Sequence, residues 1–430
     1  MDYLLSKSRV CLAGRFNAKQ GLKYKELDSS PEWERIKMST NDYEKMKGHY
    51  YQSLLRSMIE IDDEEKQSVC RYRMKLPEQC DNLMLLKKED GTQISYPCKI
   101  KNVCLWFFPY DMILFSIDIE ESTDSFSDLT LMHRIWKSWG SNYRDFCTDE
   151  LDSLLKPLVQ LTPSNNPSQI NHLGTKIRQY QVIVTEINKD EFETDTINDN
   201  LLYEVGSFSD IGIVADTDHT KSFKPSFDYY HQIIRDNTLS VYSNWKALAL
   251  NDSFTVLAIN DFFLENEFEE EFELLYMRSL LEEFYCFDRN NLYREGHRKG
   301  KAVNSKEIES EIAYMEQHYF FDDMSYDFLP PLMYRTMAKG LDLQKDREQL
   351  TQHVKQALRD ARQERNNSAV NFVQIFAVFS VFWTIHEMII TICPCIEAAI
   401  SASISFVVAI IITILLLKWP SLLTRLFQNR

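Results

Sequence analysis

Two apolar stretches near the C-terminus constrain the fold of this 430-residue chain more than any other feature. They cover 372–392 and 399–417, and the short segment 393–398 (CPCIEA) separates them. Each stretch has the ~20 residues with which an α-helix crosses a bilayer core of ~30 Å. The sequence therefore predicts a hairpin of two transmembrane helices joined by an outer loop.

Basic residues flank the predicted hairpin, and its loop has no Lys or Arg. The positive-inside rule then places both ends of the hairpin in the cytoplasm. We expect a two-span protein of the inner or plasma membrane, with both termini cytoplasmic and a cytosolic tail at 418–430. The flanking basic residues are Arg359, Arg362, Arg365, Lys418, Arg425 and Arg430.

The charge and the cysteine content of the chain exclude some functions. Asp and Glu number 64 against 48 Lys and Arg, for a net charge of −16. Because nucleic-acid recognition needs a basic surface, direct binding to nucleic acid is not expected. The nine cysteines form no CxxC pair, which argues against a zinc ribbon or a disulfide framework and favours a reducing compartment. The N-terminus shows no secretory signal pattern.

The first two thirds of the chain predict a sheet with helices, although residues 1–60 are hard to assign. Runs of β-branched and aromatic residues bounded by turn signals indicate strands. A helical pattern covers Ser127–Phe146, and 161–172 reads as a loop. The expected strands are Val69–Leu76, Lys99–Phe108, Met112–Ile119, Tyr180–Ile187, Leu201–Val205, Ile211–Val214, Trp245–Leu250 and Phe254–Ile259.

Helical patterns dominate after residue 262. Apolar residues recur at helical spacing over Phe263–Phe287 and Lys306–Tyr319, and the polar stretch Asp288–Asn304 reads as their connection. Neither Pro nor Gly occurs from Leu341 until Pro394. Such a segment predicts one helix of ~50 residues, ~75 Å long at 1.5 Å per residue, that continues into the first membrane span.

The predicted fold class is an α+β cytosolic domain plus a long stalk helix and two C-terminal transmembrane helices. The domains follow from these patterns. A cytosolic α/β sensor domain covers 1–260, and a cytosolic helical region covers 261–340. The stalk helix at 341–371 is continuous with the first span.

This order of elements resembles the CorA-like metal-ion transporter superfamily. The likeness is architectural, because the sequence HEMIITI at 386–392 lacks the Gly-Met-Asn motif that members carry at the end of the first span. The resemblance implies a homopentamer whose first spans line a central pore. Because it keeps this architecture but lacks Gly-Met-Asn, the chain is similar to a divergent CorA-like group that accompanies type III CRISPR systems. This similarity implies a response to a nucleotide second messenger and a role in antiviral defence.

A stripe of small and polar residues follows one side of the first predicted span. Hydroxyl and carboxylate groups at intervals of three and four residues can line a water-filled axis in a symmetric oligomer. The alternative is that the hydroxyls mediate helix packing and the carboxylate reaches the headgroups. The predicted ion pathway is Asn371, Gln374, Ser380, Thr384, Glu387 and Thr391.

Two further clusters are weaker candidates for ligand sites. An acidic cluster at 265–273 offers Glu267, Glu270 and Glu271 to a divalent cation, but the pattern favours a solvated helix face opposite an apolar stripe. In the helix near residue 135, basic and indole side chains could hold a phosphate and stack a base. These candidates are Arg134, Trp136, Lys137 and Trp139.

The functional hypothesis is a homo-oligomeric cation channel, gated by a cytosolic domain that senses a ligand. No phosphate loop, dinucleotide fingerprint or nucleophile elbow occurs, and we expect no enzyme activity. The expected partners are further copies of the chain, the bilayer and a small cytosolic ligand. A divalent cation and a nucleotide stay open as ligands. The alternative is a membrane-anchored enzyme or signalling protein that uses the hairpin as a tether.

Overall fold

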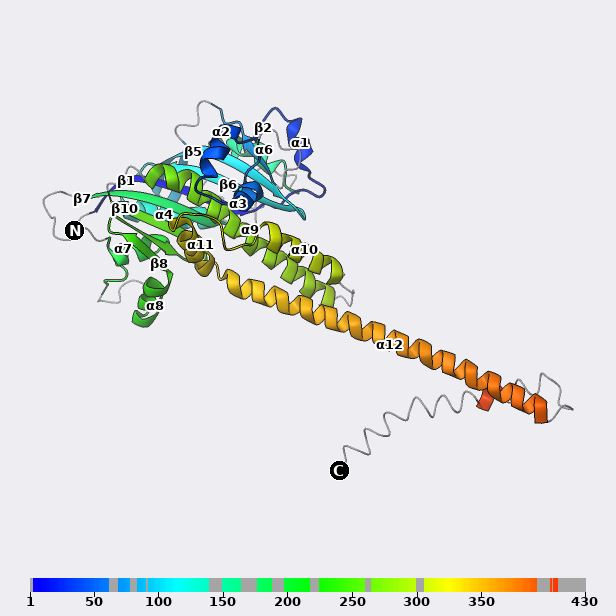
Figure 1. Ribbon diagram of the computed structural model, residues 1–430. Coiled ribbons are helices and arrows are strands. Elements are labelled where there is room, and N and C mark those ends of the chain that lie inside the picture. Colours follow the sequence, from blue (N-terminus) through cyan, green and yellow to red (C-terminus); the bar gives the residue numbers. More distant parts are fainter. Residues whose placement is uncertain are drawn as a thin grey trace. The chain divides into compact units, whose positions relative to one another are not determined.

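The computed structural model describes residues 3–61, 69–77, 83–89, 92–138, 149–163, 176–187, 197–216, 224–259, 264–298, 305–392, 403 and 405–408 (Figure 1). The chain divides into two compact units. One unit comprises Met1–Ala302 with Glu307–Thr351, and the other comprises Val303–Lys306 with Gln352–Arg430.

The first unit contains a single sheet, which has ten strands among the described residues. The strand order is β2-β3-β5-β6-β1-β7-β10-β9-β8, and β4 pairs with the long strand β5. All pairs are antiparallel except β7 with β10. The strands are β1 (Tyr3–Arg15), β2 (Trp33–Ile36), β3 (Cys70–Met74), β4 (Leu83–Glu89), β5 (Thr92–Phe108), β6 (Met112–Glu121), β7 (Arg178–Ile187), β8 (Thr238–Tyr242), β9 (Trp245–Ala249) and β10 (Ser253–Ile259).

Helices pack on both faces of this sheet. Side chains of α4, α5 and α6 join the apolar core on one face, whereas α9 contacts β1, β6 and β7 from the other face. The helices are α1 (Tyr24–Asp28), α2 (Thr40–Met46), α3 (Gln52–Met58), α4 (Phe126–Ser138), α5 (Asp149–Leu154), α6 (Lys156–Val159), α7 (Asp199–Gly206), α8 (Phe227–Asn237), α9 (Leu264–Arg298), α10 (Ser305–His318), α11 (Leu329–Gly340) and α12 (Leu343–Ile392).

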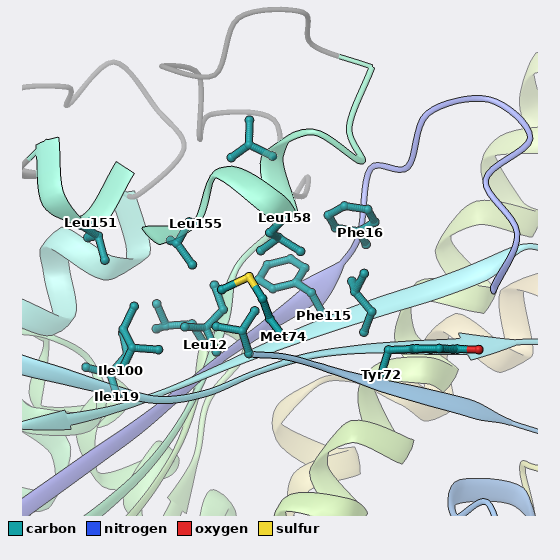
Figure 2. Close-up of a cluster of buried hydrophobic side chains, with 14 of the residues drawn as sticks. Leu12, Phe16, Tyr72, Met74, Ile100, Phe115, Ile119, Leu151, Leu155 and Leu158 are labelled. Atoms are coloured by element: carbon teal, nitrogen blue, oxygen red, sulfur yellow. The ribbon is translucent and has the colours of Figure 1, made fainter. Parts of the chain in front are cut away.

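The apolar face contains a cluster of buried hydrophobic side chains. Because side chains alternate along a strand, Val10 and Leu12 of β1 point into this core, while Arg9 and Cys11 point to the opposite face. Figure 2 shows Leu12 and Phe115 among leucines supplied by α5 and α6. The burial of these side chains fixes which residues of each strand face the other way.

Most of the predicted strands are confirmed. The predictions at Val69–Leu76, Lys99–Phe108, Met112–Ile119 and Tyr180–Ile187 correspond to β3, β5, β6 and β7. The two last predicted strands correspond to β9 and β10. The central strand β1 lies in the N-terminal region that the sequence left unassigned.

Two of the predicted strands are wrong. Leu201–Val205 belongs to helix α7, which begins after Asn198, whose side chain accepts a hydrogen bond from the backbone NH of Asn200 at 2.8 Å. A short apolar run fits a buried helix as well as a strand. Ile211–Val214 forms a turn in which the Glu204 carboxylate accepts hydrogen bonds from the backbone NH groups of Gly212 and Val214.

The predicted connection at Asp288–Asn304 is also wrong over its first part, since α9 extends to Arg298. Charged residues of this stretch make tertiary contacts. The Asp288 carboxylate accepts a hydrogen bond from Arg15 at 2.6 Å, and Arg289 pairs with Glu311 of α10 at 2.9 Å. A polar stretch is therefore not a loop when neighbouring elements supply partners of opposite charge.

The predicted membrane hairpin is overturned. Among the residues that the structure describes, no helix is both long enough and apolar enough to cross a bilayer. The long helix α12, which covers the first predicted span at 372–392, is included in this result. This finding contradicts the fold class with two transmembrane helices, the two-span topology and the inner-membrane or plasma-membrane localisation. Most of 399–417, the loop 393–398 and the tail 418–430 lie outside the described residues.

Candidate functional site

A cavity of about 1060 Å³ lies on the sheet face opposite the large apolar core. Strands β1, β3, β5 and β6 supply its floor, and α2 and α9 contribute to its wall. The strand residues that line it alternate with residues of the apolar core: Arg71 and Arg73 flank Tyr72, for example, which is buried in that core. All of these residues belong to the first unit.

Basic side chains are concentrated in this cavity. Seven Lys and Arg residues line it, although the chain as a whole carries a net charge of −16. They come from β1, β3, β5, α2 and the residue after β2, so they meet only in the folded chain. The seven are Lys7, Arg9, Lys37, Lys45, Arg71, Arg73 and Lys101.

The carboxylates of the cavity are engaged in contacts within the protein. Glu60 pairs with Arg35 at 2.8 Å, and Asp42 pairs with Lys45 at 3.0 Å. Glu120 pairs with Lys101, and Glu271 accepts a hydrogen bond from the Tyr50 hydroxyl at 2.8 Å. Lys45 and Lys101 are thus engaged by carboxylates of the same cavity, and Glu60 is engaged by Arg35, which is not among the residues that line it.

Two arginines of β3 are less engaged. The Arg71 guanidinium lies over the Trp106 ring at 3.9 Å from the ring centroid, and Arg71 and Trp106 are paired residues of β3 and β5. Within the described part of the chain, the buried Nε of Arg71 has no hydrogen-bond partner. Arg73 is exposed and forms no ion pair with any described residue. Stacking on Trp106 holds the Arg71 guanidinium in place. Arg71 and Arg73 therefore offer two cationic groups to a ligand.

A buried acidic group lies at the edge of the same cavity. Arg9 Nη2 is 2.9 Å from Glu273 Oε2 and 3.1 Å from Asp118 Oδ1, and the Cys11 thiol lies 3.7 Å from Glu273 Oε1. Burial, followed by the nearby Asp118 carboxylate, raises the pKa of Glu273 to about 8. Burial also raises the pKa of the Cys11 thiol well above its ordinary value. One guanidinium therefore serves two carboxyl groups.

A second buried network, on the apolar face, has a structural explanation. The Glu121 carboxylate accepts hydrogen bonds from the Ser8 hydroxyl at 2.9 Å and the Trp136 indole at 3.0 Å, and His133 Nε2 lies 2.8 Å from it. The carboxylate, rather than the histidine, is the centre of this group. All four side chains are buried, so the network does not have the arrangement of a serine nucleophile activated by histidine.

The predicted ligand residues near residue 135 make internal contacts. Arg134 donates to the Phe208 carbonyl and pairs with Asp210 at 2.8 Å. Lys137 pairs with Asp252 at 2.6 Å, and Trp136 is fully buried. Trp139 lies outside the described residues. The three described side chains therefore hold α4 to its neighbours rather than open to a common pocket.

The predicted acidic metal candidates are only partly described. Glu271 lies in α9 and lines the cavity. The side chains of Glu267 and Glu270 lie outside the described residues. Two residues further on, Glu273 is buried rather than solvated. The cluster therefore contributes at least two carboxylates to the cavity wall.

The residues of the predicted ion pathway lie on α12. The hydroxyls of Ser380, Thr384 and Thr391 donate to carbonyl groups one turn earlier in the same helix, at 3.0, 2.9 and 2.7 Å. Glu387 is exposed. The side chains of Asn371 and Gln374 lie outside the described residues. Without a helix that can cross a membrane among the described residues, the pathway has no support from the fold.

Sequence reasoning missed Arg9, Arg71, Arg73 and Asp118 as site residues. A signal was present in the segment VCRYRMKL, where two arginines alternate with residues of a predicted strand. Charged residues at every second position mark the face of a strand that does not join the apolar core. The sequence did not show which other segments share that face.

Comparison of the chain with protein-family models, curated proteins and solved structures returns no significant match. The functional argument therefore depends on the geometry of the cavity and on the residues that line it.

Proposed function

We propose that the first unit is a binding module for a small anionic ligand, which occupies the cavity over β3, β5, β6 and β1. Seven Lys and Arg residues line this cavity together with six Asp and Glu residues. The observation that carries the proposal is that two of the seven, Arg71 and Arg73, form no ion pair with any described residue. Anions bind where cationic donors converge and where burial weakens competition from water.

The available guanidinium groups favour a ligand with phosphate or carboxylate groups. Arg71 is held against Trp106, so less side-chain entropy is lost when it donates to a ligand. Arg73 follows on the same face of β3, and paired donors of this kind suit bidentate recognition of an oxyanion. The cavity volume of about 1060 Å³ accommodates a molecule of nucleotide size.

Calorimetric titration of the full chain with inorganic pyrophosphate, ATP and citrate tests this proposal. Pyrophosphate and citrate separate phosphate from carboxylate recognition, and ATP adds a base to the phosphates. We expect binding of at least one probe, with an affinity that falls as salt rises because screening weakens exposed charge pairs.

The matched variants are Arg73→Gln and Arg235→Gln. Loss of a charge-assisted hydrogen bond costs ~1.5–3 kcal/mol, so Arg73→Gln should weaken binding by ~10-fold or more. Arg235 lies on α8 outside the cavity lining and pairs with its neighbour Asp236, so Arg235→Gln should leave binding unchanged. If no probe binds at ~1 mM, or if both variants weaken binding equally, the proposal is wrong.

A further inference from the structure

Three side chains with metal-binding atoms converge beside the anion cavity. The thiol of Cys11 and the carboxylates of Asp118 and Glu273 place one ligand atom each within 4.8 Å of one another. Cys11 and Asp118 are paired residues of β1 and β6, and α9 brings Glu273 over them. Two strands and a helix therefore assemble the group, and it does not depend on a single loop.

A bound metal ion would change the charge balance of this group. When the thiol and both carboxyl groups are ionised they carry three negative charges, and the nearby guanidinium of Arg9 supplies one positive charge. A dication would restore neutrality with Arg9 still in place. Buried charges are stable when they are paired or coordinate a metal ion.

One carboxylate oxygen of the group is under-satisfied. Asp118 is 3% exposed, and its Oδ1 accepts no hydrogen bond in the described part of the chain, although Arg9 Nη2 lies 3.1 Å away. Buried polar atoms without hydrogen bonds are uncommon and call for an explanation such as a bound ion. Asp118 and Glu273 also line the cavity, which gives an ion a path to the buried thiol of Cys11.

We propose that Cys11, Asp118 and Glu273 bind a divalent transition-metal ion of the zinc class. Zinc accepts thiolate and carboxylate ligands at ~2.0–2.3 Å, so binding would draw the three ligand atoms closer together around the ion. Three protein ligands leave a fourth position open toward the cavity. The proposal does not depend on anion binding, because the ion alone is the ligand.

Cobalt substitution of the full chain tests the site directly. Chelator-treated protein is titrated with Co²⁺ alone, and absorption from thiolate-to-cobalt charge transfer is followed. We expect this absorption in the natural chain, its loss in Cys11→Ser, and its retention in Cys98→Ser. Cys98 is the matched control because it is buried in the apolar core on the other face of the sheet.

Competition by Zn²⁺ measures affinity in variants that keep the thiol. Asp118→Asn and Glu273→Gln should each weaken Zn²⁺ binding by ~10-fold or more, since each replaces an anionic ligand. Circular dichroism verifies that each variant is folded. Absence of thiolate absorption in the natural chain, or its persistence in Cys11→Ser, would overturn the proposal. Unchanged Zn²⁺ affinity in both carboxylate variants would overturn it as well.

Discussion

The two faces of the ten-stranded sheet use the same strands in opposite ways. On one face, Leu12 and Phe115 pack with side chains of α4, α5 and α6 in an apolar core. On the other, Arg9 and Asp118 alternate with these residues along the same strands and meet Glu273 of α9. One face is held by burial of apolar surface, and the other contains charges that need specific partners.

The two faces therefore place different physical demands on the residues of one sheet. Apolar packing is non-directional and tolerates small adjustments, whereas buried charges stabilise only with good geometry and cost free energy without it. A protein that needed only stability could fill both faces with apolar residues. The charged face is therefore the part of the sheet that calls for a functional explanation.

The largest expected effect comes from the apolar face. Phe115→Ala removes a buried ring that packs edge-to-face on Phe16, with ring centroids 6.5 Å apart. Large-to-small changes of this kind lower the free energy of unfolding by ~3–5 kcal/mol. Denaturant unfolding followed by circular dichroism measures the change, and a loss below ~1 kcal/mol would mean that the face is not closely packed.

On the charged face, Arg9→Met should lower the free energy of unfolding by ~3 kcal/mol, because it leaves two buried carboxyl groups without their cation. The double variant with Glu273→Gln should recover part of the loss, since one buried acid is then removed. A double-mutant cycle in chelator-containing buffer measures this coupling. Strictly additive losses would show that Arg9 and Glu273 do not interact.

The charged face should also make stability depend on pH. The ordinary pKa of a glutamate is 4.5, and that of Glu273 is raised to about 8 in the folded chain. Between these values the folded chain holds a proton that the unfolded chain has released. The free energy of unfolding therefore falls as pH rises, by at most ~1.4 kcal/mol per pH unit for this group.

Glu273→Gln should reduce that slope in chelator-containing buffer, as measured by denaturant unfolding at a series of pH values. The slope should not vanish, because burial also raises the pKa of Asp288, Glu311 and Asp346. An identical slope in the variant would mean that Glu273 titrates normally in the folded chain.

The smallest expected effect on stability comes from the arginine proposed to contact the ligand. Arg73 is exposed and forms no ion pair with a described residue, so Arg73→Gln should change the free energy of unfolding by less than ~0.5 kcal/mol. The same variant should weaken anion binding. A thermal melt without ligand checks the first expectation, and a large destabilisation would place Arg73 in the structural framework.

Local patterns were sufficient for much of the sheet. The β-branched and aromatic runs of β5, β6 and β7 identify these strands. Three residues, 109–111, connect β5 and β6, with positive φ at Tyr110 and Asp111. The run at 201–205 was misassigned because its length and apolar character fit both structures. Only its packing against β9 and β10 selects the helix.

The site could not be predicted from the sequence in the same way. Cys11 is separated from Asp118 by more than one hundred residues, and Glu273 is separated from both by an even longer stretch. The acidic cluster at 265–273 is evident in the sequence, but its pattern predicts a solvated helix face for all of it. Burial of Glu273 against Arg9 depends on α9 crossing β1, which no local pattern records.

The alternation of side chains along the strands and the long uninterrupted helix at α12 can be predicted from sequence alone, because both depend on local backbone preference and periodicity. The tertiary structure decided which strands are neighbours, and so which charges meet in the cavity. It also overturned the predicted transmembrane helices, since among the described residues no helix meets the length and apolar character of a span. Long-range pairing is set by the packing of the whole sheet, and a linear pattern carries too little information about it.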